Sequence, residues 1–300
     1  MNNTTTSATS AASTEPAVGG AHRSFAGYVA VGDSFTEGMC DELLPDGQFR
    51  GWADRVAAAL AAERPGEEFR YANLAVRGKL IGQICAEQVD RAAAMRADLV
   101  TLAGGLNDVL RPGCDIAEVE RLLGRAATGL LDGNADGNAD GKADGGPGAG
   151  CGDGPTVVMF TSTDPTRRLA GSARLLPAIL EMKSFVEGLA RRYPNVLVVD
   201  LFSAPCFDDR RMWAEDRLHL SPEGHRRVAA AVLEALGRPA GFDWRAPLPP
   251  AEPRSRGERL GSDLRWLRIH LGPWIGRRLT GRSSGDNRPP KRAELLPYEG

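Results

Sequence analysis

The chain has 300 residues, of which 42% are apolar and 25% charged, and its formal net charge is -2. This length suits one sizeable α/β domain with appendages or two small domains, and the composition is typical of a globular protein. The charge argues against a nucleic-acid-binding protein, because such proteins carry a clear basic excess. The sequence has no run of about 18 apolar residues, which argues against a membrane-spanning helix.

The N-terminal segment is poor in large apolar residues. Residues 1–16 have neither the charged start nor the apolar stretch of a secretion signal, and we expect residues 1–23 to be disordered. The cysteines are odd in number and include no Cys-x-x-Cys pair: Cys40, Cys85, Cys114, Cys151 and Cys206. This pattern favours reduced thiols over a disulfide framework or a zinc site, so we expect a cytoplasmic protein.

From residue 24 onward, short apolar runs alternate with patterns of helical length. The runs that predict strands cover residues 28–31, 69–74, 98–102, 156–160 and 196–201. The helical patterns cover residues 52–63, 80–95, 116–131, 175–193 and 222–236. Such alternation is typical of parallel strands joined by helical crossovers. We predict a three-layer α/β/α sandwich over residues 24–238, with a five-stranded parallel sheet in the order 2-1-3-4-5.

A Gly/Asp/Ala-rich tract at residues 132–154 interrupts this alternation. It contains D-x-N-x-D-G twice, which resembles the beginning of a calcium-binding loop. The closing glutamate of such a loop is missing, since Ala143 and Pro147 occupy the twelfth positions, and no exiting helix follows. We interpret the tract as a flexible surface insertion between a helix and the fourth strand.

The C-terminal tail, residues 239–300, is rich in proline and arginine. It carries 12 lysines and arginines against 7 acidic residues. Within residues 258–282, leucines recur every three to four residues among arginines, which predicts an amphipathic segment. This segment either contacts an anionic membrane surface weakly or packs its apolar face on the domain. The dipeptide Gly272-Pro273 interrupts any long helix and favours packing on the domain.

A serine follows the first predicted strand. The sequence Gly-Asp-Ser-Phe at residues 32–35 ends that strand, and ligands of open α/β sheets bind at the carboxyl ends of the strands. A serine at a helix start also gains backbone N–H donors and a field that favours negative charge. Such turns are common, so Ser34 by itself is only a candidate nucleophile.

A histidine follows the fifth predicted strand at the same edge of the sheet. His219 and Asp216 are three residues apart, which lets both side chains face one site. A serine hydroxyl becomes a nucleophile when a neutral imidazole takes its proton, and a carboxylate fixes the tautomer of that imidazole. The alternative is an exposed loop histidine beside a salt-bridging aspartate. His225 lies inside the last predicted helix, and we interpret it as a packing or capping residue.

Four sequence blocks together resemble the SGNH/GDSL hydrolase family of GDSL-like lipases and acylhydrolases. They read Gly-Asp-Ser-Phe at 32–35, Asn-Leu-Ala-Val-Arg-Gly at 73–78, Gly-Leu-Asn-Asp at 105–108 and Asp-Arg-Leu-His at 216–219. The resemblance spans about residues 25–237 and implies the flavodoxin-like fold of that family. Phe35 replaces the leucine of the motif that names the family, which is a mild departure.

The resemblance implies roles for five residues. Ser34 would be the nucleophile, His219 the base and Asp216 the partner that orients the base. The oxyanion hole would consist of the backbone N–H groups of Ser34 and Gly78 and the side-chain amide of Asn107. Taken alone, Gly78 would be a helix-start glycine and Asn107 a turn or N-cap residue, so the inference depends on their joint appearance after successive strands.

Other residues near these blocks have structural or lining interpretations. Asp33 and Asp108 are interpreted as structural, each accepting hydrogen bonds from nearby backbone N–H groups. Residues 161–165 follow the fourth predicted strand and should line the same rim. Five residues are candidates for an acyl or alcohol pocket, with core packing as an equal alternative: Phe35, Met39, Leu106, Leu110 and Trp213.

The blocks together predict an esterase that cleaves small-molecule esters, such as acyl esters, lysolipids or acetylated compounds, through an acyl-enzyme. An acyltransferase with the same site is one alternative, and a non-catalytic binding module on the same fold is another. A flavin- or nucleotide-binding protein is disfavoured, because Gly-x-Gly-x-x-Gly and Walker-type loops are absent from the sequence. The sequence implies no cofactor, metal or nucleic-acid partner and does not define the oligomeric state.

Overall fold

The computed structural model describes residues 23–133, 154–169, 171–253, 255–273, 276 and 283–299. The N-terminal segment expected to be disordered falls almost wholly outside these residues. So do the D-x-N-x-D-G repeats of the insertion, Cys151, and most of the amphipathic segment beyond Pro273. The predictions for these parts of the chain therefore stay predictions.

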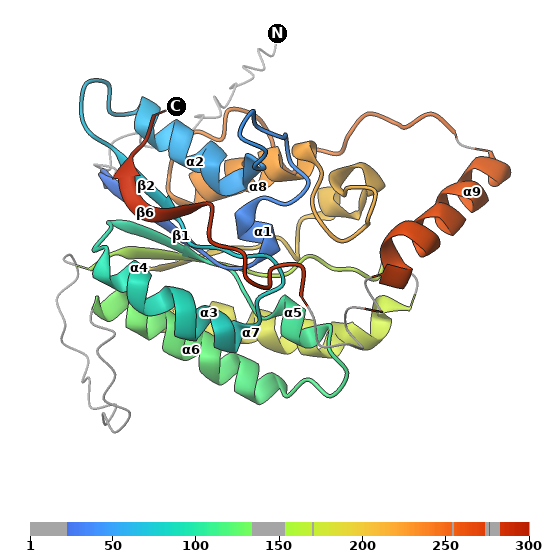
Figure 1. Ribbon diagram of the computed structural model, residues 1–300, viewed down its shortest axis with the longest axis horizontal. Coiled ribbons are helices and arrows are strands. Elements are labelled where there is room, and N and C mark those ends of the chain that lie inside the picture. Colours follow the sequence, from blue (N-terminus) through green and yellow to red (C-terminus); the bar gives the residue numbers. More distant parts are fainter. Residues whose placement is uncertain are drawn as a thin grey trace, which may run out of the picture.

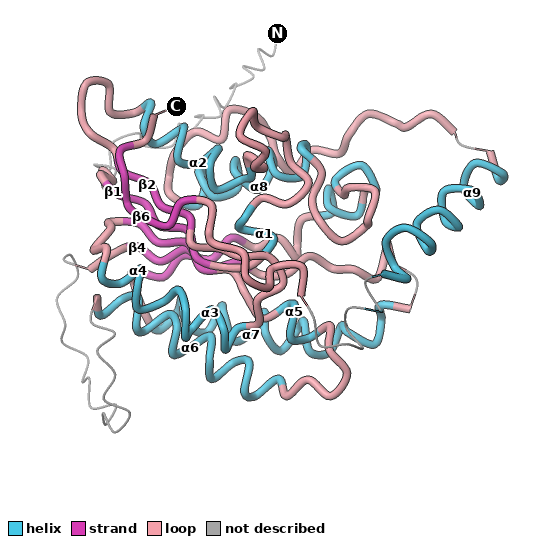
Figure 2. The backbone as a smooth tube through the Cα atoms, in the orientation of Figure 1, coloured by secondary structure: helices cyan, strands magenta, loops and turns pink. Residues whose placement is uncertain are grey.

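A mostly parallel sheet forms the middle layer of the described structure (Figure 2). Its strands lie in the order β5-β4-β3-β1-β2-β6. The pairs β1–β2, β1–β3, β3–β4 and β4–β5 are all parallel, so the predicted order 2-1-3-4-5 is confirmed. The five parallel strands are β1 (Gly27–Val31), β2 (Arg70–Asn73), β3 (Leu99–Leu102), β4 (Thr156–Phe160) and β5 (Val196–Val199).

The sheet has a sixth strand that the sequence analysis did not predict. β6 (Arg292–Pro297) pairs antiparallel with β2 and lies beside it in Figure 1. Leu295 packs on the core, and Tyr298, just beyond the strand, contacts Phe69 and Tyr71. No side chain of this edge strand is fully buried, and such a strand has a weak apolar pattern, so nothing in the Pro/Arg-rich tail indicated it. The three-layer fold is confirmed, whereas the count of five strands was one too low.

Two long helices cover one face of the sheet, α2 (Gly51–Ala62) and α8 (Pro222–Ala235) (Figure 1). Their apolar sides form one core cluster with the sheet, in which Trp52 and Val228 are fully buried. α8 begins as predicted: the Ser221 hydroxyl accepts the N–H of Gly224, and proline is the first helical residue.

The opposite face is covered by α6 (Ile116–Asp132), α7 (Leu176–Arg192) and a helix with a π-helical turn. That helix runs through α3 (Ile81–Ile84), the turn η1 (Cys85–Val89) and α4 (Asp90–Ala94). The apolar stripe of α6 enters the second core cluster of the sheet. All five predicted helices are therefore present.

Five short helices lie in the segments that connect the strands and long helices. They are α1 (Ser34–Glu37), α5 (Leu106–Val109), η2 (Ser172–Leu175), η3 (Pro205–Asp208) and η4 (Arg210–Met212).

The described part of the amphipathic segment forms α9 (Arg256–Trp266) and the π-helical η5 (Leu267–Leu271), set to one side of the sandwich (Figure 1). Leu260 is 61% exposed and Leu264 58% exposed. The apolar face of these described residues is therefore not packed on the domain, which contradicts that interpretation of the sequence. No helix in the described ranges combines the length and the apolar character needed to cross a bilayer.

α9 contacts the domain through polar and aromatic groups at its C-terminal end. The indole N–H of Trp266 donates to the carbonyl oxygen of Asp216 at 2.8 Å. The Arg217 guanidinium forms an ion pair with Asp263 and lies 4.7 Å from the centre of the Trp266 ring. The tail is thereby attached to the loop that carries Asp216 and His219.

Candidate active site

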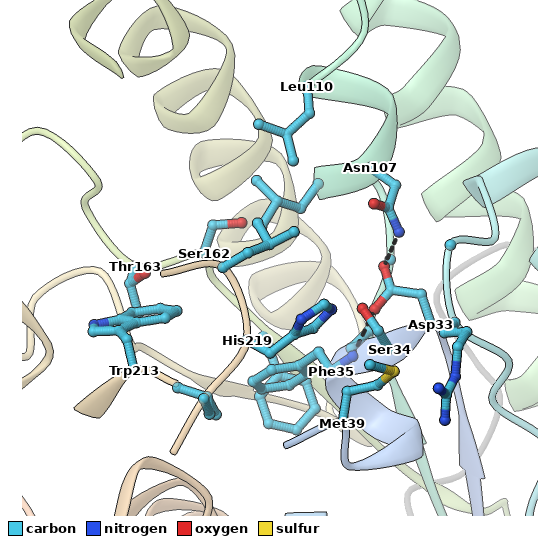
Figure 3. Close-up of a pocket in the computed structure, with 18 of the residues that line it drawn as sticks. Asp33, Ser34, Phe35, Met39, Asn107, Leu110, Ser162, Thr163, Trp213 and His219 are labelled. Carbon is cyan, nitrogen blue, oxygen red and sulfur yellow. Dashed lines mark hydrogen bonds between the residues drawn. The ribbon is translucent and has the colours of Figure 1, made fainter. Parts of the chain in front are cut away.

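The carboxyl ends of the parallel strands open into one pocket, with a cavity volume of about 190 Å³. Four of the five predicted site residues line it: Ser34, Gly78, Asn107 and His219. In Figure 3, Asp33, Ser34 and Asn107 lie on one side of the pocket and Trp213, Ser162 and Thr163 on the other, with His219 between them.

Ser34 is the first residue of α1, directly after β1. The buried carboxylate of Asp33 caps this turn by accepting the N–H of Phe35 at 3.0 Å. Gly32 precedes it where a Cβ atom would lie 2.6 Å from the carbonyl oxygen of Ala103. Only glycine lets β1 and the loop after β3 approach this closely.

His219 and Asp216 interact directly. The His219 Nδ1 and the Asp216 Oδ2 are 2.6 Å apart. The other oxygen of Asp216 accepts the backbone N–H groups of Leu218 and His219, both at 3.0 Å. Arg217 between them has φ +61°, so a left-handed turn folds the four-residue loop back on its own carboxylate.

The ionisation of this pair follows from its surroundings. Burial would lower the pKa of His219, but the hydrogen bonds of its ring with Asp216 and Cys40 and the charge of Asp216 outweigh burial and raise that pKa to about 9. Burial would raise the pKa of Asp216, but the hydrogen bond and charge of His219 and two backbone N–H groups lower it to about 2. The pair therefore favours imidazolium and carboxylate in the absence of substrate.

Cys40 is a third member of this cluster that the sequence analysis missed. Its thiol donates to Asp216 Oδ2 at a distance of 3.9 Å. Within the described ranges, Cys40, Asp216 and His219 are the one group of potential metal ligands, with ligand atoms within 4.8 Å of one another. The hydrogen bonds of the cluster occupy these same atoms. No motif in the sequence marked Cys40.

Asn107 is tied to Asp33. Its amide nitrogen donates to Asp33 Oδ2 at 2.9 Å and to the carbonyl oxygen of Lys79 at 3.1 Å. Burial raises the pKa of Asp33 to about 6, against the N–H of Phe35 and the charge of His219, which lower it. Asp33 and Asp108 both accept backbone N–H groups, as the sequence analysis proposed, and Asp108 does so from Ile81 at 3.0 Å.

Gly78 lies where the C-terminal tail crosses the site. It has φ +76°, a backbone conformation that residues with a side chain rarely adopt. A Cβ atom here would also lie 2.1 Å from the Ser283 hydroxyl, so both the backbone and the available space require glycine. The preceding N–H, of Arg77, donates to Glu37 Oε2 at 2.6 Å, and the two side chains form an ion pair. Glu37, which is buried, thus holds the peptide segment that leads to Gly78. No motif in the sequence indicated this contact.

Gln88 holds the strand end that precedes Ser34. Its side-chain oxygen accepts the N–H of Gly32 at 2.8 Å, and its nitrogen donates to the carbonyl oxygen of Gly32 at 2.9 Å. Gln88 is only 3% exposed and lies in the π-helical turn η1. A polar residue on the buried face of the predicted helix was the signal in the sequence that could have revealed this role.

His225 has the packing role that the sequence analysis assigned to it. The N–H of Trp52 donates to its Nδ1 at 3.2 Å, so its Nε2 carries the proton and donates to the carbonyl oxygen of Met39 at 3.0 Å. Burial lowers the pKa of His225 to about 4. This imidazole is therefore neutral and has both nitrogens engaged.

The pocket walls agree with the expected lining residues. All five candidates line the pocket: Phe35, Met39, Leu106, Leu110 and Trp213. The rim after β4 contributes residues 161–163, and the C-terminal tail contributes Ser283 and Ser284, which the sequence analysis did not anticipate.

The described chain is a three-layer α/β/α domain with a pocket at the carboxyl edge of its mostly parallel sheet. The chain belongs to the GDSL-like Lipase/Acylhydrolase family, whose model matches residues 30–227. The protein is therefore a hydrolase that acts on ester bonds. A search of the curated proteins found no match.

Solved structures share the fold at low sequence identity. An α/β hydrolase from the metagenome of Lake Arreo, Spain, is 22% identical, with a TM-score of 0.53 over 73% of this chain and 98% of that one. An acetylxylan esterase from Geobacillus stearothermophilus is 19% identical, with a TM-score of 0.51 over 72% and 94%. A lipase/acylhydrolase from Enterococcus faecalis is 21% identical, with a TM-score of 0.50 over 70% and 95%.

The raised pKa of His219 can be measured directly. NMR titration of the imidazole should give a pKa of about 9, and Asp216→Asn should lower it toward or below the ordinary value of 6.5, because burial then dominates. A folded-state pKa above the unfolded value means that the pair stabilises the protein below about pH 6.5 and loses this contribution as the pH rises through 9. His225 is the internal control, and its pKa should stay near 4. An unchanged His219 titration in Asp216→Asn would show that the carboxylate does not control this imidazole.

Proposed function

We propose that the protein is a serine esterase that works through an acyl-enzyme, with Ser34 as nucleophile, His219 as general base and Asp216 as the residue that orients the base. The observation that carries this proposal is the 2.6 Å contact between His219 Nδ1 and Asp216 Oδ2 in the wall of the pocket that contains Ser34. This contact leaves Nε2 as the nitrogen available for proton transfer.

The proposed reaction has two stages, acylation of Ser34 and hydrolysis of the acyl-enzyme. His219 Nε2 takes the proton of the Ser34 hydroxyl as its oxygen attacks the ester carbonyl, and the resulting imidazolium passes that proton to the departing alcohol oxygen. Water then attacks the acyl-enzyme in the same way and releases the acid. Because only neutral imidazole accepts the first proton, turnover should increase as the pH approaches the pKa of His219.

The oxyanion hole proposed for this site has three donors: the backbone N–H groups of Ser34 and Gly78 and the amide of Asn107. The Glu37 contact with Arg77 supports the position of Gly78. Asn107 donates to Asp33 in the absence of substrate, so one of its N–H groups must turn to the substrate oxygen. Loss of one such donor costs a hundred- to a thousand-fold in rate, by order of magnitude.

Small acyl groups suit the pocket best. A cavity of about 190 Å³ bounded by Phe35, Leu106 and Leu110 accommodates a short acyl chain. The acetylxylan esterase that shares the fold acts on acetyl esters by its name, and we propose acetylated or short-chain esters for this chain as well. We place hydrolysis before acyl transfer, because the family is one of hydrolases.

An esterase assay tests the proposal. Purified wild-type protein, Ser34→Ala and the exposed control Ser203→Ala are compared on p-nitrophenyl esters of graded acyl length. Wild type and Ser203→Ala should turn over the short esters, whereas Ser34→Ala should lose at least about a thousand-fold, as expected for a triad nucleophile. Equal activity of wild type and Ser34→Ala would remove Ser34 from the mechanism.

We further propose a cytoplasmic location and a weak contact of α9 with anionic membrane surfaces. The four cysteines that the structure describes are free thiols, which suits a reducing compartment.

The membrane contact is inferred from three leucines that are exposed along one side of α9 and η5: Leu260, Leu264 and Leu267. Arg256 and Arg265 are nearby. Exposed leucines beside arginines are typical of segments that lie on an anionic bilayer.

Vesicle sedimentation tests this contact. Wild-type protein should bind vesicles that contain phosphatidylserine more than vesicles of phosphatidylcholine alone. Leu264→Glu should reduce binding about tenfold, because it removes apolar area and adds a repelled charge. Ser262→Glu makes a similar charge change at a less apolar position and should reduce binding less. Equal binding of all variants, or no binding by the wild type, would contradict the proposal.

A further inference from the structure

Arg168 places a positive charge in the wall of the active-site pocket without a contacting counter-charge. It lines the pocket, and no carboxylate of the described residues lies within ion-pair distance of its guanidinium. Its Nε is buried without a hydrogen-bond partner. Its Nη1 donates to the carbonyl oxygen of Arg217 at 2.9 Å. The neighbouring Arg167, by contrast, is exposed and paired with Asp208.

Stacking fixes the orientation of this guanidinium. Its central carbon lies 3.4 Å from the centre of the Trp213 ring, and the indole N–H of Trp213 is held by the carbonyl oxygen of Phe207 at 2.8 Å. A guanidinium is planar through its own bonding, and the stacking contact restricts the orientation of that plane. Arg168 is therefore presented to the pocket as a rigid, planar donor, which is the form that carboxylate and phosphate groups bind best.

The local electrostatics favour an anion at this position. Burial lowers the pKa of Arg168 to about 10, and the charge of Arg210 acts in the same direction. Asp164 and Asp208 act in the opposite direction, but neither contacts the guanidinium. A buried cation that has lost water and gained no contacting opposite charge is costly, and a bound anion would offset that cost.

The position of Arg168 relative to His219 indicates which part of a substrate would carry the anion. In the proposed mechanism, His219 gives its proton to the departing alcohol oxygen, so the alcohol lies on the His219 side of Ser34. Figure 3 shows Trp213, the stacking partner of Arg168, beyond His219 on that side, together with Ser162 and Thr163. Both hydroxyl residues line the pocket with Arg168.

We propose that Arg168 is a specificity-determining residue that binds a carboxylate or phosphate group on the alcohol portion of the ester. The proposal rests on the proposed esterase function. It gives the substrate class as short-chain esters of an anionic alcohol. The competing role for Arg168 is purely structural: its bond to the Arg217 carbonyl would position the loop of residues 216–219, which carries His219, and would serve every ester equally.

A matched pair of esters separates the two roles. 4-Acetoxybenzoate and its methyl ester share the acetyl group and differ in the charge on the leaving alcohol. For Arg168→Gln, kcat/KM should fall about 10- to 100-fold on 4-acetoxybenzoate, the effect of one lost charged hydrogen-bonding pair. On the methyl ester it should change less than about threefold. Arg168→Lys keeps the charge but not the planar fork, and should retain part of the preference. Arg167→Gln removes the same charge outside the pocket and should match wild type.

Each other outcome overturns the proposal. An equal loss on both esters in Arg168→Gln would assign Arg168 to loop positioning alone, and no loss on either ester would leave it without a role. The esterase function is tested separately by comparing wild type and Ser34→Ala on the methyl ester. Turnover by wild type that is lost in Ser34→Ala supports that function whatever Arg168 does. If wild type hydrolyses neither ester, calorimetric titration with 4-hydroxybenzoate decides on the anion site. Wild type should bind it at least about tenfold more tightly than Arg168→Gln, and equal or undetectable binding overturns the proposal.

Discussion

Parallel pairing of β1 with β2 on one side and with β3 on the other brings the loops after three strands to one edge of the sheet. Those loops carry Ser34, Gly78 and Asn107. A shift of one residue in either pairing would turn the alternating side chains to the opposite faces and separate the three groups. The two apolar clusters on the faces of the sheet prevent such a shift, because each strand is buried from both sides.

Buried polar side chains then fix the loops that the sheet brings together. Gln88 holds Gly32 before the serine, Glu37 holds the N–H of Arg77 before Gly78, and Asp33 joins its own turn to Asn107. Each of these groups lost water on burial and recovers hydrogen bonds only in this arrangement of the loops. The same contacts that satisfy the buried groups therefore define the geometry of the pocket.

The strands, the long helices and the residues around the pocket were predictable from the sequence, because each depends on local periodicity or on a short motif after a strand. β6 was not, because an exposed edge strand has little apolar pattern. Gln88 depends on a π-helical turn, and Glu37 and Arg168 act through contacts with distant segments, which no spacing rule reports. Cys40 reaches Asp216 across 176 positions of the chain, so its part in the cluster required the fold.

Covalent trapping is the sharpest test of Ser34 as nucleophile, since it does not depend on knowing the natural ester. Wild-type protein and His219→Ala are treated with an alkyl fluorophosphonate, and the adduct is located by peptide mass spectrometry. With Ser34 as nucleophile and His219 as its base, this assignment predicts one adduct on Ser34 in wild type and a much slower reaction in His219→Ala, because the serine then lacks its base. An adduct on another residue, or equal labelling of both proteins, would contradict it.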